Sequence, residues 1–395
     1  MKETSGINYQ KKDLPGSFNM LGWVFVIIGA VLLALSYYVD HDRAAFNTTI
    51  MFMFILSIGL GSLFFVALEY LVGAVWSVPF RRIGEFMAAL LIIAPLLAIP
   101  IIMNMHGLFH WTHMEDVIAD PFLSKKVPYL NEPFFIIRTL IFFVVMILFF
   151  FVLAGRSLKQ DKTGDYRHTK TNKVASALFM PFFAIFTTII AIDYLMTLEP
   201  HWFSTIFGVY YFAGTFLAAL AVLTYVSVTL SEAGYMTKYI NNDHYYNFGA
   251  LMFAFVNFWA YIAFSQFLLI WYANIPEETF WFIDRWQGSW MWVTIGLIFI
   301  HFIVPYAVLL SQPSKRNPKV LKFISIWIII AHFYDLYWIV MPTYSHDNAI
   351  LGWMELMVPI LPVGLLLVVF NFMAKRKNLI PVNDPKIKSG LRFRL

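Results

Sequence analysis

The sequence predicts an all-α polytopic membrane protein with ten transmembrane helices, and three observations support this fold class. Of the 395 residues, 60% are hydrophobic and only 13% are charged, whereas a soluble domain carries roughly 25% charged residues. The mean hydropathy is +0.70. The apolar residues form ten continuous runs of 22 to 26 residues, and about 20 suffice to cross the hydrocarbon core as a helix.

These apolar runs define the expected helices in chain order. Because hydrocarbon offers no water to the backbone, each run must satisfy its own hydrogen bonds, which favours a helix. The runs also lack the alternation of transmembrane β-strands. The longest connection, 106–132, has 27 residues, so we expect no separate soluble domain. The expected spans are 18–39, 50–75, 84–105, 133–155, 175–198, 205–230, 248–273, 289–311, 320–341 and 350–374.

A short repeat predicts how the spans are grouped. Asp193 lies in the fifth span with Pro200 seven residues later, and Asp335 lies in the ninth with Pro342 at the same spacing. Spans an even number apart keep their direction, so such a duplication is parallel. We therefore expect two four-helix bundles and two peripheral helices within a transmembrane domain, flanked by cytoplasmic tails. The bundles cover about 50–198 and 205–341, the domain covers 18–374, and the tails cover 1–17 and 375–395.

Lys and Arg are distributed unequally between the two sides of the membrane. They concentrate in the N-terminal tail, which includes Lys2, Lys11 and Lys12, in the connection 156–173 and in the C-terminal tail. Because cytoplasmic connections are enriched in Lys and Arg, both termini are expected to be cytoplasmic. The opposite connections are rich in Trp, Tyr, His and acids instead, which suits interfacial anchors or a docked partner.

Charge and cysteine content exclude several functions. The net charge is +5, but the basic residues fall in short blocks between apolar runs. That pattern reflects membrane topology, so we expect no nucleic-acid partner. The chain has no cysteine. It therefore cannot form disulfides or hold thiolate metal sites, Cys-ligated iron–sulfur clusters or covalently attached c-type haem.

Several ionisable residues lie within the predicted spans, where isolated charges are costly and usually have a role. One interpretation is a proton relay, and the other is a set of buried ion pairs that fix the helix packing. His332 and Asp335, three residues apart, share a helical face. The relay candidates are Glu69, Asp193, His301, His332, Asp335 and Glu355.

Three residues near the outer ends of spans could instead bind a quinone or another polar head group. They are Arg138, Asp193 and His201. Arg138 and Asp193 lie at the same level of antiparallel neighbouring spans, so they could equally form an ion pair. The sequence leaves both interpretations open.

Three histidines follow the third span, at His106, His110 and His113. They would share one face if the helix continued outward, and imidazoles at this spacing can bind a metal. Gly107 and Asp120-Pro121 weaken that continuity, so we favour an interfacial connection and expect no metal site in this chain. His301 and His332 lie on different spans, which makes a haem site equally unexpected.

Three longer stretches resemble a known family. The chain is similar to the NrfD-like membrane subunits of the polysulfide reductase family, and within it to the ActF-type subunits of bacterial alternative complex III, a quinol:cytochrome c oxidoreductase. The stretches include Trp76-Ser77-Val78-Pro79-Phe80-Arg81-Arg82, Trp111-Thr112-His113-Met114-Glu115 and Asp193-Tyr194-Leu195-Met196-Thr197-Leu198-Glu199-Pro200-His201-Trp202.

The resemblance implies a multi-pass subunit of a respiratory complex in the bacterial inner membrane. Its partners would be a sister ten-helix subunit, an iron–sulfur subunit, multihaem cytochrome c subunits and in some assemblies a terminal oxidase. Iron–sulfur clusters and haem would belong to those partners. This chain would scaffold them, contact lipid and menaquinone or ubiquinone, and conduct protons.

One position departs from the family pattern. The resemblance implies that the quinol-oxidising sister subunits carry a histidine after the glycine that corresponds to Gly59, where this chain has Leu60. Leucine cannot accept a quinol proton. We therefore expect a subunit that is not catalytic alone. The alternative prediction is a secondary transporter with a parallel internal repeat, which ten spans and buried charges also suit.

Overall fold

The computed structural model describes residues 12–395, and ten of its helices are long and apolar enough to cross a membrane. The described residues form helices and connections without a β-strand, so the predicted all-α polytopic fold class is confirmed. Lys2 and Lys11 lie outside the described residues. The spans are α1 (Gly16–Val39), α2 (His41–Val72), α3 with α4 (Arg81–Ala88, Leu90–Met103), α8 (Glu132–Thr163), α9 (Arg167–Tyr194), α10 (Phe207–Glu232), α11 (Asn242–Ala273), α13 with η4 and α14 (Trp290–Leu297, Ile298–Ile303, Val304–Leu310), α16 (Pro318–Tyr344), and α17 with α18 (Trp353–Met357, Ile360–Arg376).

Several helices extend beyond their predicted apolar runs. Helix α8 continues to Thr163 and ends at Gly164, whose φ of 67° suits a glycine C-cap. Helix α11 begins at Asn242, where Asn241 and His244 form a capping box. Hydropathy marks the hydrocarbon slab, whereas the caps decide where each helix ends, so the prediction missed these polar turns.

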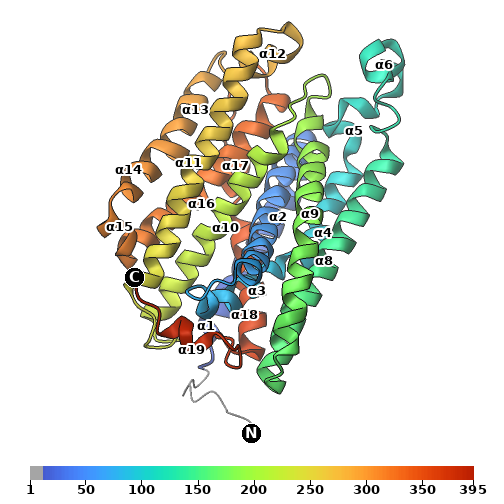
Figure 1. The fold of residues 1–395 in the computed structure, drawn as a ribbon. Coiled ribbons are helices and arrows are strands. Elements are labelled where there is room, and N and C mark those ends of the chain that lie inside the picture. Colours follow the sequence, from blue (N-terminus) through green and yellow to red (C-terminus); the bar gives the residue numbers. More distant parts are fainter. Residues whose placement is uncertain (1–11) are drawn as a thin grey trace.

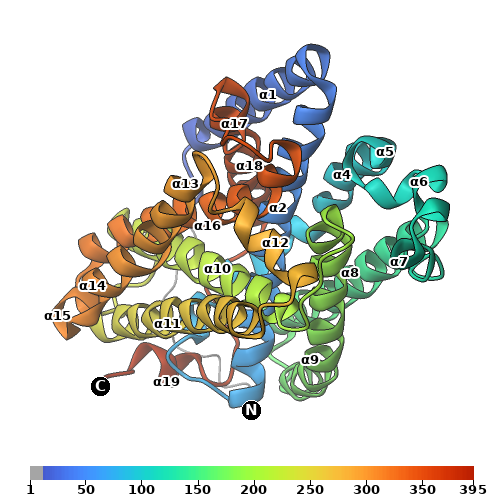
Figure 2. The same cartoon turned by 90° about the horizontal axis from the view of Figure 1, so that it is seen from above.

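Helices α2 and α10 form the centre of the molecule and pack against each other. Helix α2 also packs on α4 and α9, and α8 packs on α4 and α9. On the other side α10 packs on α11 and α16, and α11 on α14. Helices α1 and α18 pair with each other at the periphery. Figure 2 shows α2 and α10 between these two groups of helices.

The two ends of the molecule are formed by different helices. Helices α3 and α19 (Ile387–Leu391) lie at one end, which we call the terminal side, and α6 (Met114–Ala119) and α12 (Pro276–Asp284) lie at the other, the loop side (Figure 1). The C-terminal segment is folded onto the terminal side, since Nε2 of His244 lies 2.8 Å from the carbonyl oxygen of Gly390. The prediction of a plain basic tail did not include this packing.

The contact between α2 and α10 depends on a residue without a side chain. A Cβ atom at Gly61 would lie 2.5 Å from Cβ of Ala219 and 2.8 Å from the carbonyl oxygen of Thr215. Such distances are closer than carbon atoms tolerate, so the two central helices can approach this closely only with glycine at this position.

Gly61→Ala should therefore separate α2 from α10 and destabilise the protein by about 1–3 kcal/mol, the usual cost of overpacking. The matched control is Gly155→Ala in α8, where nothing lies within 4 Å of the added carbon. Thermal unfolding of the purified protein in detergent measures both. A Gly61→Ala variant as stable as the control would contradict the close-packing explanation.

Candidate functional site

Three buried ionisable side chains lie together among the helices that pack around α10. His332 and Asp335 come from α16, and His301 comes from η4 in the neighbouring span. Their nitrogen and oxygen ligand atoms all lie within 4.8 Å of one another. Each residue is at most 2% exposed. The predicted shared face of His332 and Asp335 is thus confirmed, and His301 joins them.

Hydrogen bonds connect this central cluster to α10 and α2. The Tyr210 hydroxyl donates to Oδ1 of Asp335. Nε2 of His332 lies 3.0 Å from Oγ of Ser57, which in turn lies 3.0 Å from the Tyr211 hydroxyl and 3.2 Å from Oγ1 of Thr215. The cluster therefore connects α16 and η4 to α10 and α2. Its side chains include groups that can both donate and accept hydrogen bonds.

A local widening of its helix positions His301. Residues Ile298–Ile303 form a π-helix, a feature that often marks functional positions. Pro305 provides the cause, because it lacks the N–H that would bond the carbonyl of His301 four residues earlier. The His301 ring stacks on Trp259 with ring centroids 3.8 Å apart. Within residues 12–395, neither of its ring nitrogens has a hydrogen-bond partner.

The backbone of a glycine lies close beside the cluster. A Cβ atom at Gly214 would lie 3.2 Å from Nδ1 of His332 and 3.5 Å from Oδ2 of Asp335. Nδ1 of His332 also lacks a partner among the described residues. Unsatisfied buried polar groups are costly and call for an explanation. A site that exchanges protons with water is one such explanation.

A cavity of about 580 Å³ adjoins the cluster between α10, α11, α13 and α16. Tyr210 and Trp259 line it from the side of the cluster. Tyr261 and Phe264, 65% and 60% exposed, line it from the outer surface of α11. The cavity thus connects the lipid-facing surface with side chains that contact Asp335 and His301.

On the terminal side, Glu69 belongs to a buried ionic network. Nη1 of Arg81 donates to Oε1 of Glu69 at 2.9 Å, and Arg81 also pairs with Asp384 of the C-terminal segment. Arg82 pairs with Glu85, and its Nη2 donates to Asp161 of α8 at 2.7 Å. The network holds four carboxylates and two guanidinium groups, so it can accept protons without losing all of its ion pairs.

On the loop side, Arg138 of α8 and Asp193 of α9 form the ion pair that the sequence allowed. Nε and Nη2 of Arg138 lie 2.8 and 3.0 Å from the two carboxylate oxygens. The guanidinium also lies over the Tyr129 ring, 3.9 Å from its centroid. Both partners are buried, and this bidentate geometry is the strongest form of such a pair. The polar atoms that form this pair are therefore not available to bind a ligand.

Two other candidates pair with loop-side residues. Glu355 of α17 accepts from Nε of Arg43 at 2.8 Å and from Nδ2 of Asn47 at 2.9 Å. Nε2 of His201 lies 2.6 Å from Oδ2 of Asp120. The hydrogen bond from His201 and those from backbone N–H groups lower the pKa of Asp120 to about 2. His201 is 42% exposed and pairs with Asp120 instead of Arg138 or Asp193.

Arg285, which the sequence analysis did not single out, is a buried cation. It is 1% exposed and donates to the carbonyl oxygens of Trp281, Trp338 and Ile339. Burial lowers its pKa to about 9, which still leaves it charged at neutral pH. Its carbon Cζ lies 3.4 Å from the Trp281 ring centroid. The tryptophans around it in the sequence were a signal for this cation–π site.

The candidates therefore separate into three levels. His301, His332 and Asp335 converge at the centre, Glu69 lies in the terminal-side network, and Asp193 and Glu355 lie in loop-side ion pairs. The quinone candidates do not converge, because Arg138 and Asp193 are mutually satisfied and His201 lies elsewhere in the loop-side connections. No protein-family model matches the sequence, and none of the curated proteins matches it.

Asp193→Asn should destabilise the protein by about 3–5 kcal/mol, because it leaves the buried Arg138 guanidinium without its counter-charge. The double substitution Arg138→Gln with Asp193→Asn should recover part of this loss, since no uncompensated charge remains. Thermal unfolding in detergent measures the cycle. A single variant as stable as the parent would argue against a structural role for the pair.

Proposed function

We propose that this protein is an integral subunit of a quinol:cytochrome c oxidoreductase of the bacterial inner membrane, with both termini in the cytoplasm. In this proposal it holds no metal redox centre. It scaffolds iron–sulfur and multihaem cytochrome c subunits on its loop side, and it lies beside a sister ten-helix subunit and in some assemblies a terminal oxidase. Within this complex it conducts protons.

One observation carries the proton-conducting role, namely the buried cluster of His301, His332 and Asp335 with its hydrogen bonds to Tyr210 and Ser57. Hydrocarbon offers no partners to such groups, so their presence at the bundle interior favours a function. A purely structural ion pair would satisfy its own atoms, as Arg138 and Asp193 do. The central cluster instead retains imidazole nitrogens without partners among residues 12–395.

Two of the three levels of ionisable groups suit a relay across the membrane. The terminal-side network around Glu69 would take up protons, and the central cluster would hold them. The loop-side pairs of Asp193 and Glu355 are satisfied ion pairs, so in this proposal they fix the helix packing and do not carry protons. Protons cannot cross dry hydrocarbon, so water or side-chain motion must bridge the levels. The imidazole nitrogens without partners among residues 12–395 are groups that such water could bond.

The loop side supports the scaffolding role. It carries exposed aromatic side chains, with Trp286 in a connection 41% exposed and Trp353 at the start of α17 42% exposed. Aromatic residues are enriched where proteins bind one another and where they meet the membrane interface. Iron–sulfur and haem subunits docked here would cover them.

Quinone contact has weaker support. The cavity of about 580 Å³ has the size and apolar lining of a ligand site, and menaquinone or ubiquinone could enter it from lipid. Leu60 has no group that could accept a quinol proton. We therefore propose that quinol oxidation takes place in the sister subunit and that this chain contributes a lipid- or quinone-filled groove at most.

The complex, purified from native membranes and reconstituted into vesicles, tests the relay. Asp335→Asn and Glu69→Gln should each lower the number of protons translocated per electron more than they lower electron flux. The matched control is Glu232→Gln, because Glu232 is an exposed terminal-side acid that pairs with Lys322 at 2.7 Å. The control should leave both quantities unchanged.

Two results would contradict the proposal. Equal effects of Asp335→Asn on proton translocation and electron flux would leave only a structural role for the cluster. Recovery of the chain as a lone oligomer, without haem- and iron–sulfur-containing partners, would contradict its assignment to a respiratory complex.

The orientation has a direct test because the chain has no native cysteine. Ser389→Cys on the terminal side and Ser124→Cys on the loop side place single thiols at exposed positions. A membrane-impermeant maleimide applied to intact spheroplasts should label Ser124→Cys, whereas Ser389→Cys should react only after permeabilisation. The reverse pattern would place the termini outside.

A secondary transporter is the second candidate. The cavity adjoins a span that is interrupted by the π-helix Ile298–Ile303, and interrupted spans line the substrate sites of many transporters. The loop-side aromatic surface has no role in that function. Solute uptake by the isolated chain in proteoliposomes would favour the transporter.

A further inference from the structure

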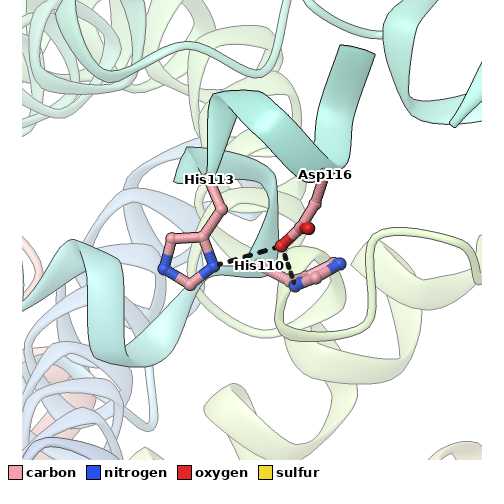
Figure 3. A group of neighbouring side chains, drawn as sticks. All are labelled: His110, His113 and Asp116. Atoms are coloured by element: carbon pink, nitrogen blue, oxygen red, sulfur yellow. Dashed lines mark ion pairs between the residues drawn. The ribbon is translucent and has the colours of Figure 1, made fainter. Parts of the chain in front are cut away.

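The loop-side connection between α4 and α8 brings three metal-binding side chains together. Figure 3 shows His110, His113 and Asp116 pointing toward one another. Nδ1 of His110 lies 3.9 Å from Oδ2 of Asp116, and Nδ1 of His113 lies 3.8 Å from the same oxygen. The three ligand atoms all lie within 4.8 Å of one another.

The backbone that carries these side chains is anchored in the protein. His110 begins the 3₁₀ helix η2 (His110–Thr112), and Asp116 lies in the first turn of α6. Between and after the ligands, Trp111, Thr112 and Val117 are buried. The segment thus turns Trp111, Thr112 and Val117 inward and its three ligands outward.

A neighbouring ring orients one of the ligands. His106 stacks on His113 with ring centroids 5.6 Å apart and an interplanar angle of 4°. Nε2 of His106 is 3.4 Å from the carboxylate of Glu132 at the start of α8. The stack fixes the plane of the His113 ring, as outer-shell residues do around metal ligands. His106 is therefore a positioning residue and not a ligand.

The separations suit a small divalent cation. Zn–N and Zn–O bonds of about 2.0–2.2 Å in tetrahedral geometry place neighbouring ligand atoms about 3.3 Å apart. The two separations to Asp116, 3.9 and 3.8 Å, exceed this value by about half an ångström, and the two histidine nitrogens lie no more than 4.8 Å apart, so small side-chain rotations bring the three atoms to bonding positions. Two imidazoles and one carboxylate also match the ligand preference of zinc.

We propose that His110, His113 and Asp116 form a binding site for one Zn²⁺ ion on the loop side of this protein. The three side chains are about half exposed, so the ion enters directly from solvent. Three protein ligands leave a fourth position for water or for a group from a docked partner. This site is independent of the proposed proton relay, because its residues lie outside the membrane-spanning helices.

Zinc titration of the purified full-length chain, with an affinity tag that contains no histidine, tests the proposal. Competition with a chromophoric chelator should reveal one Zn²⁺ equivalent per chain. His113→Ala should weaken this equivalent at least about tenfold, as should His110→Ala. Asp116→Asn should weaken it while keeping the shape of the side chain. Each variant should elute and unfold like the parent, since the altered side chains are exposed.

The matched control is His346→Ala. His346 is another exposed loop-side histidine, and its Nδ1 lies 3.9 Å from Oδ2 of Asp284. It lies outside both groups of side chains that could hold a metal ion among the described residues, the loop-side group and the buried cluster of His301, His332 and Asp335. This control should keep the Zn²⁺ equivalent. A parent chain that binds none, a His113→Ala variant that keeps the equivalent, or a control that loses it would overturn the proposal.

Co²⁺ substitution gives a second readout. Bound Co²⁺ should show visible absorption bands of a low-coordinate nitrogen and oxygen site, and His113→Ala should abolish them. Bands that persist in His113→Ala would place the ion elsewhere and overturn the assignment.

Discussion

The bilayer interior offers no hydrogen-bond partners, so every polar group within the spans must find a partner inside the chain. Three buried ionic groups on the loop side meet this constraint within the chain. Arg138 holds Asp193 in a bidentate pair, Arg43 and Asn47 satisfy Glu355, and Arg285 is satisfied by three carbonyl oxygens. These contacts connect α8 to α9, α2 to α17 and the loop-side end of α16 to the α12 connection, and so determine the packing of the loop side.

The central cluster differs from these loop-side groups because its satisfaction is incomplete. Among the described residues this also holds for Glu69, Arg81 and Arg82 of the terminal-side network. Tyr210 bonds Asp335 and Ser57 bonds His332, yet the remaining imidazole nitrogens have no partner among residues 12–395. The π-helix that presents His301 costs regular helical hydrogen bonds. An interior with unsatisfied polar atoms and irregular backbone at the same point is typical of functional positions. This contrast distinguishes ionisable residues with a candidate function, as in the central cluster, from ionisable residues in satisfied pairs that fix the helix packing.

The same reasoning distinguishes the two sides of the molecule. On the terminal side, the C-terminal segment returns to the helices and places Asp384 against Arg81, so the chain end completes the ionic network. On the loop side, the histidine-bearing connection around α6 projects away from the spans (Figure 1), and aromatic side chains such as Trp286 are exposed. One side is closed by its own chain, and the other presents groups that can bind partners or ions.

Hydropathy alone determined the number of spans, because the cost of burying a polar backbone in lipid depends on local composition and not on tertiary contacts. Spacing along one helix likewise predicted the shared face of His332 and Asp335. Contacts between distant segments could not be predicted from hydropathy or from spacing along one helix. The approach of His301, the pairing of Asp384 with Arg81, the burial of Arg285 and the meeting of Asp116 with two histidines each depend on where a helix is interrupted or a connection turns back. Those events are decided by side-chain packing in three dimensions, as at Gly61, where the absence of a single carbon atom sets the distance between the two central helices.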